Sequence, residues 1–188
     1  MSGDCKRNEI KFGNNEIVIC NYLFSNYLNN DEMMQRIGLE DYIFIPETPE
    51  NYVDSKPVGR VDFQVFSTDR FRHRNRYFII ECKRLDGGSD LNRKYIDKGI
   101  RRFVDIPPKY TSHFKMNCML GIAVKTFDFE ENINNINYLL EKEYPDIHVH
   151  TYLTNWHYLN IFFSLHGNNE SERIILLHAV TDCSSYVE

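Results

Sequence analysis

The chain has 188 residues, 42 % of them hydrophobic, which is enough for one well-buried domain covering residues 1–188. Its 13 Phe and 12 Tyr argue against intrinsic disorder, and its five scattered cysteines form no Cys-x-x-Cys pair. No apolar run approaches the roughly 20 residues that cross a membrane. Composition therefore excludes a disordered chain, a disulfide scaffold and a membrane-spanning protein, and it favours the reducing cytoplasm.

The net charge of −5 is distributed unevenly along the chain. Residues 56–109 carry 14 Lys and Arg against 7 Asp and Glu, a local charge of +7, whereas the remainder carries 8 against 20. Concentrated positive charge is what binding to phosphate groups needs. The segment therefore indicates either a nucleic-acid partner or a set of solvated loops with one amphipathic helix.

The first half of the chain predicts a helix followed by three strands. Apolar residues recur at helical spacing after a pair of capping asparagines, which predicts a helix over 14–29. A short strand over 42–46 is expected to stop at a proline-rich loop over 46–57. Two apolar runs, joined by a basic turn, predict strands over 60–66 and 76–83.

The second half alternates helices and strands. A helix over 91–105 is ended by a Pro-Pro pair and leads to a buried strand over 116–126 and a helix over 129–144. Three late strands are predicted over 148–153, 159–166 and 173–180. His166 and His178 are expected to face each other across the last hairpin. This order predicts one α/β domain with a mixed central sheet.

One acidic triplet stands out by its position. The pattern Asp/Glu-x-Lys occurs four times, but only Glu81-Cys82-Lys83 ends an apolar strand and follows another strand that begins with an acid, Asp62. Glu81 and Lys83 share one face of their strand, because alternate side chains point the same way. A buried acid and lysine on one face must be paired or used in function. The alternative to a functional site is a salt bridge at the strand end.

These residues resemble the signature of the PD-(D/E)xK phosphodiesterase superfamily. Gly59-Arg60-Val61-Asp62 is followed after 18 residues by Glu81-Cys82-Lys83, with Val61 where the motif has proline. The resemblance implies a restriction-endonuclease-like fold, whose αβββαβ core would cover about residues 14–126. A C-terminal helix and three strands would extend this core.

The resemblance also implies a metal centre. Asp62, Glu81 and the backbone carbonyl of Cys82 would bind Mg²⁺, a hard ion that prefers oxygen ligands, and Mn²⁺ would substitute for it. Lys83 would position or deprotonate the attacking water, or stabilise charge on the phosphate. Glu16 falls where the superfamily often places a helix-one acid beside the metal. The alternative is that Glu16 is a first-turn acid that favours the helix dipole.

Several residues are candidates for contact with a nucleic-acid backbone. On the helix over 91–105, Tyr95, Lys98 and Arg102 form a line at positions i, i+3 and i+7. Tyr95 also belongs to the apolar stripe of this helix. The candidates are Arg60, Arg72, Arg74, Arg84, Tyr95, Lys98 and Arg102. A solvated basic face is the alternative for any of them.

The expected function is that of a Mg²⁺-dependent endonuclease, with DNA as the expected substrate and RNA left open. A homodimer or larger complex and a prokaryotic defence or mobile-element setting are further expectations, by analogy with the fold. The alternative is a catalytically silent nucleic-acid-binding or assembly subunit on the same fold. An intact set of Asp62, Glu81 and Lys83 argues against silence, because a buried acidic cluster is costly.

Overall fold

The computed structural model describes residues 11–53, 56–68, 76–157, 160–167 and 173–188. Its strands are β1 (Tyr42–Val53), β2 (Lys56–Ser67), β3 (Phe78–Leu85), β4 (Met116–Ala123), β5 (Val149–Asn155), β6 (Ile161–His166) and β7 (Ile174–Asp182). They form one mixed sheet in the order β1-β2-β3-β4-β7-β6-β5. β3, β4 and β7 run parallel, and the outer strands pair antiparallel, so the predicted α/β class with a mixed sheet is confirmed.

The helices come in the predicted order, with two short additions. The first helix comprises α1 (Glu16–Leu23) and the π-helical turn η1 (Phe24–Leu28), and the unexpected α2 (Asp31–Arg36) follows it. The second comprises α3 (Ser89–Tyr95), the π-helical turn η3 (Ile96–Ile100) and α4 (Arg101–Val104). α5 (Phe129–Lys142) and the short 3₁₀-helix η5 (Ser184–Tyr186) complete the set. Within the described ranges, no helix is long and apolar enough to cross a membrane.

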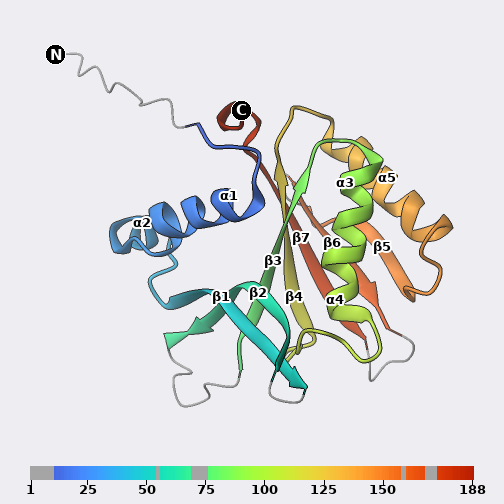
Figure 1. Cartoon of the computed structure of the whole chain (residues 1–188), viewed down its shortest axis with the longest axis horizontal. Coiled ribbons are helices and arrows are strands. Elements are labelled where there is room, and N and C mark those ends of the chain that lie inside the picture. Colours follow the sequence, from blue (N-terminus) through green and yellow to red (C-terminus); the bar gives the residue numbers. More distant parts are fainter. Residues whose placement is uncertain (1–10, 54–55, 69–75, 158–159, 168–172) are drawn as a thin grey trace.

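Helices cover both faces of the sheet (Figure 1). Along β3, Ile79 and Leu85 pack with α3, α4 and α5, whereas Ile80 and Cys82 pack with α1. This alternation is the period-two pattern of a strand that is buried on both faces. Glu81 and Lys83 therefore share their face with Ile79 and Leu85, beneath the helix formed by α3 and α4.

The predicted proline-rich loop over 46–57 is wrong. β1 continues through this region to Val53, and Pro46 and Pro49 pair with Phe63 and Arg60 of β2. An edge strand tolerates proline because only one of its sides forms a hydrogen-bonded ladder. β1 is the outermost strand of the described sheet, so long-range pairing with β2 overrides the local proline signal.

A chain of buried polar groups links the two late histidines to the central helix. The Tyr95 hydroxyl lies 2.9 Å from His178 Nδ1, and Ser164 Oγ lies 2.7 Å from both His178 Nε2 and His166 Nε2. One direction of donation, from Tyr95 through His178 and Ser164 to His166, satisfies these three contacts with neutral imidazoles. The expected pairing of His166 with His178 therefore exists, but through Ser164.

Acid is expected to destabilise the protein through His178. Burial lowers the pKa of His178 from its ordinary 6.5 to about 3, so below pH 6.5 the unfolded chain binds a proton that the folded chain rejects. The free energy of unfolding should fall as pH falls through this window, by on the order of 4 kcal/mol for this group. Urea unfolding of the wild type and His178→Gln between pH 7 and pH 4 measures it, because other groups cancel in the difference. Equal pH slopes in the two proteins would contradict the prediction, and His148→Gln, an exposed histidine, is the control.

Candidate active site

The site lies where β2 and β3 separate. Their hydrogen-bonded register ends at the pair Phe63–Ile80, and the next step would set Asp62 opposite Glu81. At this point Asp62 Oδ2 accepts a hydrogen bond of 2.6 Å from the backbone N–H of Cys82. The aspartate side chain thus replaces a strand partner, and the opening holds two carboxylates from neighbouring strands.

Lys83 joins the strand acids to the first helix. Its Nζ lies 2.8 Å from Glu81 Oε1, 2.8 Å from Glu16 Oε1 and 2.5 Å from the carbonyl oxygen of Cys82. Glu16 is the first residue of α1, which Asn15 caps, and its Oε2 accepts from the backbone N–H of Arg84 at 3.3 Å. The structure therefore brings together the four residues Asp62, Glu81, Lys83 and Glu16. The role of Glu16 as a metal ligand stays a prediction.

Glu81 has two further partners. Arg102 Nη1 of α4 lies 2.7 Å from Glu81 Oε1, and the Tyr110 hydroxyl donates to Glu81 Oε2 at 2.9 Å. The Arg102 guanidinium also bonds to the Tyr110 hydroxyl and lies over the Tyr110 ring, 5.4 Å from its centroid. Both oxygens of this buried carboxylate are thus engaged by protein donors.

Two glycines allow the close packing around the site. A Cβ atom on Gly59 would lie 2.8 Å from the Tyr110 ring, and one on Gly99 would lie 2.3 Å from the end of the Met119 side chain and 3.4 Å from Lys83 Cγ. Both distances to the first neighbour are shorter than real Cβ contacts. Gly59 thus allows Tyr110 to reach Glu81, and Gly99 lets its helix lie close over β3 and β4.

The electrostatics of the site follow from burial and mutual repulsion. Burial, reinforced by Asp62, raises the pKa of Glu81 to about 7, although Lys83 and Arg102 oppose the shift. Burial also raises the pKa of Asp62, against the effect of Lys83 and the Cys82 N–H. Burial alone would lower the pKa of Lys83, but Glu81, Glu16 and Asp62 together raise it, so Lys83 stays protonated at neutral pH.

The carboxylates are not arranged as a preformed metal cage. In the part of the chain that the structure describes, no three His, Cys, Asp or Glu side chains form a group that could hold an ion. The reason lies in the orientation of Glu81, whose oxygens are directed at Lys83, Arg102 and Tyr110. A cation could bind Glu81 Oε1 only after Lys83 or Arg102 moves.

The prediction that Tyr95 contacts phosphate is wrong. Its side chain is only 1 % exposed, and its hydroxyl bonds to His178 in the core. The π-helical turn η3 begins directly after Tyr95, and its wider turn breaks the alignment of positions i, i+3 and i+7 that a regular α-helix gives. Tyr95 belongs to the apolar stripe of this helix.

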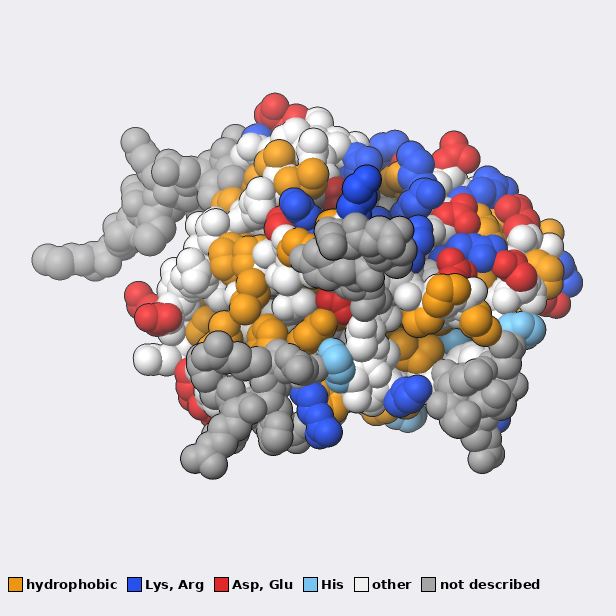
Figure 2. Space-filling view, turned by 60° about the horizontal axis from the view of Figure 1, so that its bottom comes forward, with side chains coloured by type: hydrophobic (Ala, Val, Ile, Leu, Met, Phe, Trp, Pro, Cys, Tyr) orange, Lys and Arg blue, Asp and Glu red, His pale blue; other side chains and the backbone are white. Residues whose placement is uncertain are grey.

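The other phosphate candidates have different surroundings. Arg60 is exposed and lies 3.2 Å from Glu47, and Arg84 Nη1 donates to the Asn14 carbonyl at 2.6 Å. Lys98 is exposed, and the described residues offer it no ion pair within 4 Å. Figure 2 shows Lys and Arg side chains gathered on the upper part of one face. In this view the side of the molecule that carries α3 and α4 at the front of Figure 1 is turned upward. Arg72 and Arg74 lie outside the described residues.

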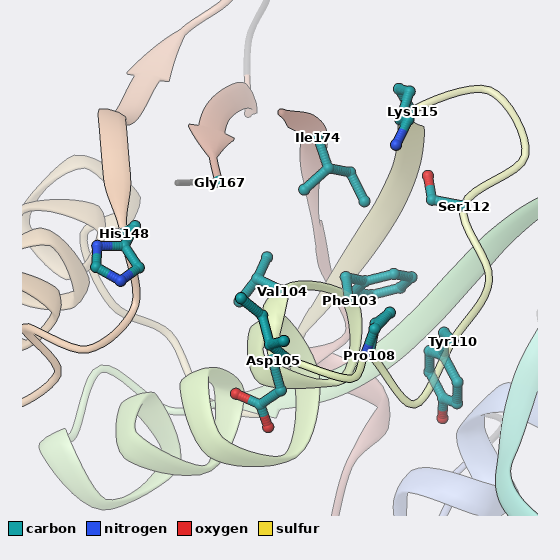
Figure 3. Close-up of a pocket in the computed structure, with 11 residues that line it drawn as sticks. Phe103, Val104, Asp105, Pro108, Tyr110, Ser112, Lys115, His148, Gly167 and Ile174 are labelled. Carbon is teal, nitrogen blue, oxygen red and sulfur yellow. The ribbon is translucent and has the colours of Figure 1, made fainter. Parts of the chain in front are cut away.

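Tyr110 is the site residue that sequence reasoning missed. Its backbone N–H donates to the Arg102 carbonyl at 2.9 Å, and the next N–H, of Thr111, donates to Glu50 Oε1 at 3.1 Å. The ring borders a cavity of about 260 Å³, and Figure 3 shows its hydroxyl directed away from that cavity. No periodic pattern marks Tyr110, which follows the Pro-Pro pair in a loop, so the only available signal was an aromatic residue after a helix end.

No family model, curated protein or solved structure matches the chain. The interpretation of the site therefore rests on its own geometry.

Proposed function

We propose that this protein is a Mg²⁺-dependent phosphodiesterase of the PD-(D/E)xK superfamily that cuts nucleic acid, with DNA as the expected substrate. The observation that carries the proposal is the opening between β2 and β3, where Asp62 caps the Cys82 N–H beside the buried Glu81 and Lys83. The order of helices and strands over 14–126 supports a restriction-endonuclease-like core. A cytoplasmic setting is part of the proposal, since the four described cysteines are free thiols.

The donor set at this opening suits Mg²⁺. Asp62, Glu81 and the Cys82 carbonyl offer hard oxygen ligands, with Glu16 adjacent through Lys83. Three acids face two cations, Lys83 and Arg102, and burial, reinforced by Asp62, raises the pKa of Glu81 to about 7. A divalent ion would balance the charge, and when bound it would acidify a water molecule and neutralise phosphate oxygens.

The side chains of the chain itself have separable roles in this proposal. Because its pKa is raised, Lys83 serves as a charged donor to a phosphate oxygen or to the attacking water and not as a base. Asp62 is held by the Cys82 N–H, which fixes one oxygen of its carboxylate at the place where β2 and β3 separate. The exposed Lys98 of η3 and the exposed Lys94 of α3 support contact with a polyanion.

One observation favours the alternative of a silent nucleic-acid-binding subunit. Glu81 is held by Arg102 and Tyr110 in addition to Lys83, which is the arrangement expected of a structural ion-pair network. The two functions differ in outcome, because a silent subunit would bind nucleic acid without cutting it under any metal.

Labelled DNA and RNA incubated with the purified protein and Mg²⁺, Mn²⁺ or EDTA test the proposal. We expect cleavage that needs a divalent metal and stops in EDTA. Binding without cleavage under all metals would replace the enzyme with the silent subunit. Comparing the two polymers decides the substrate, and gel filtration decides whether a dimer forms.

A further inference from the structure

Two cations hold Glu81, but only one of them reaches solvent. The Lys83 side chain is 8 % exposed, whereas the Arg102 side chain is 28 % exposed although its Nη1 lies 2.7 Å from the fully buried Glu81 carboxylate. Arg102 stands on α4, one turn after the exposed Lys98. It is therefore the more accessible of the two cations for an arriving polyanion.

Both acceptor sites of Glu81 Oε1 are filled in this arrangement. Oε1 accepts from Lys83 and Arg102, and Oε2 accepts from the Tyr110 hydroxyl. A divalent cation can bind Oε1 only if Lys83 or Arg102 leaves it, and the departing charge must find another anion. The single hydrogen of the Tyr110 hydroxyl is shared between Glu81 and the Arg60 carbonyl, 2.6 Å away, and Lys83 is also held by Glu16 and Cys82.

We propose that Arg102 blocks the metal site until nucleic acid binds. A backbone phosphate offers the guanidinium a two-point contact, which a carboxylate oxygen shared with Lys83 does not. When Arg102 turns to that phosphate, Glu81 loses one positive partner and becomes a ligand for the cation. This inference rests on the proposed function and adds a regulation to it: metal and nucleic acid bind cooperatively, and each strengthens the other by the same factor.

This coupling keeps the metal site of Glu81 closed while no nucleic acid is bound. In the absence of nucleic acid, Arg102 neutralises the buried Glu81, so the protein remains stable without a metal. In its presence, a cation held by Glu81 would balance that charge instead. Arg102 is thus a positioning residue, because it acts on the metal site through Glu81.

Metal affinity without nucleic acid tests the inference directly. Mn²⁺ binding is measured from the electron paramagnetic resonance signal of the free ion, with and without a short phosphorothioate DNA duplex that resists cutting. We expect Arg102→Gln to bind Mn²⁺ about tenfold more tightly than the wild type when no DNA is present, within the usual range for coupled sites. DNA should then strengthen Mn²⁺ binding less in this variant than in the wild type.

Arg101→Gln is the matched control. Arg101 is the adjacent arginine of α4, but it pairs with Asp97, Asp105 and Asp146 and does not touch Glu81. The substitution Arg101→Gln removes the same charge as Arg102→Gln and should leave the Mn²⁺ affinity unchanged. Arg102→Lys keeps the charge and should restore most of the block, and thermal melting confirms that each variant folds.

The possible failures are distinguishable. Unchanged or weaker Mn²⁺ binding in Arg102→Gln, with a wild type that binds Mn²⁺ and cuts DNA, overturns the inference alone. Equal tightening in Arg102→Gln and Arg101→Gln also overturns it, since long-range charge would then explain the effect. A wild type that binds no Mn²⁺ with or without DNA and cuts nothing overturns the proposed function and the inference together.

Discussion

Asp62→Asn and Glu81→Gln should each abolish measurable cleavage. Both substitutions keep the size of the side chain but remove a negative charge from the place where β2 and β3 separate. Loss of one group that stabilises transition-state charge costs roughly a thousandfold in rate, and Mn²⁺ binding should weaken by roughly the hundredfold seen when metal-site groups are removed. Cleavage rates and Mn²⁺ titrations of the two variants measure both effects.

The two acid variants should differ in stability. Asp62→Asn keeps an oxygen that can accept from the Cys82 N–H, so the strand opening survives. Glu81→Gln removes a buried carboxyl group whose pKa is raised to about 7. Without metal, this variant should therefore lose less stability than the wild type as pH rises from about 4.5 to about 7. The sign follows because the folded wild type binds a proton in that window that the unfolded chain releases.

Asp90→Asn is the control for these variants, because its side chain is 95 % exposed and pairs only loosely with Arg93. It should retain wild-type cleavage. Wild-type rates in Asp62→Asn or Glu81→Gln, after removal of contaminating nuclease is verified with the control, would contradict the assignment of this opening as the active site.

Lys83→Met should reduce turnover while sparing metal binding. The lysine is a charged donor that also competes with a cation for Glu81 and the Cys82 carbonyl. Its loss should therefore lower the cleavage rate and at the same time remove a competitor of the metal. We expect the cleavage rate to fall by about a hundredfold, as for one lost electrostatic donor, and the Mn²⁺ dissociation constant to stay equal or decrease. Single-turnover cleavage and Mn²⁺ titration separate the two quantities.

The pH profile provides a second readout for Lys83. Because neighbouring acids raise its pKa, Lys83 should not titrate between pH 6 and pH 9. The cleavage rate of the wild type should therefore show no rise with pH that comes from deprotonation of Lys83. Lys98→Met, on the exposed face of η3, is the control and should reduce binding of nucleic acid more than the rate at saturation. Loss of Mn²⁺ binding in Lys83→Met would assign the lysine a structural role instead.

Local pattern identified the strand residues of the site. The apolar run before Glu81 and the alternation of β3 placed Glu81 and Lys83 on one face, and the capped helix placed Glu16 in its first turn. Asp62 was recognised as the acid in a preceding strand. The common face of Glu81 and Lys83 and the first-turn position of Glu16 needed only the period of two in strands and the capping preference of helices, whereas the site role of Glu16 was implied by the resemblance to the superfamily.

Local pattern failed where packing or pairing over long distances decided the outcome. The prolines of 46–57 predicted a loop, but pairing along β2 made this segment an edge strand. In the sequence, Tyr95 fits both the line of phosphate candidates and the apolar stripe of its helix. In the structure, the π-helical turn follows Tyr95 and its side chain is buried in the core.

The sequence alone determined the order of helices and strands, the mixed α/β class and the common face of Glu81 and Lys83, because these depend on the residues next to each other in the chain. Only the tertiary structure decided that Arg102 and Tyr110 meet Glu81, 21 and 29 residues away. That contact depends on how closely α4 and the loop after it approach β3, which Gly59 and Gly99 permit. Distances between separate elements are set by packing across the core, and no local period encodes them.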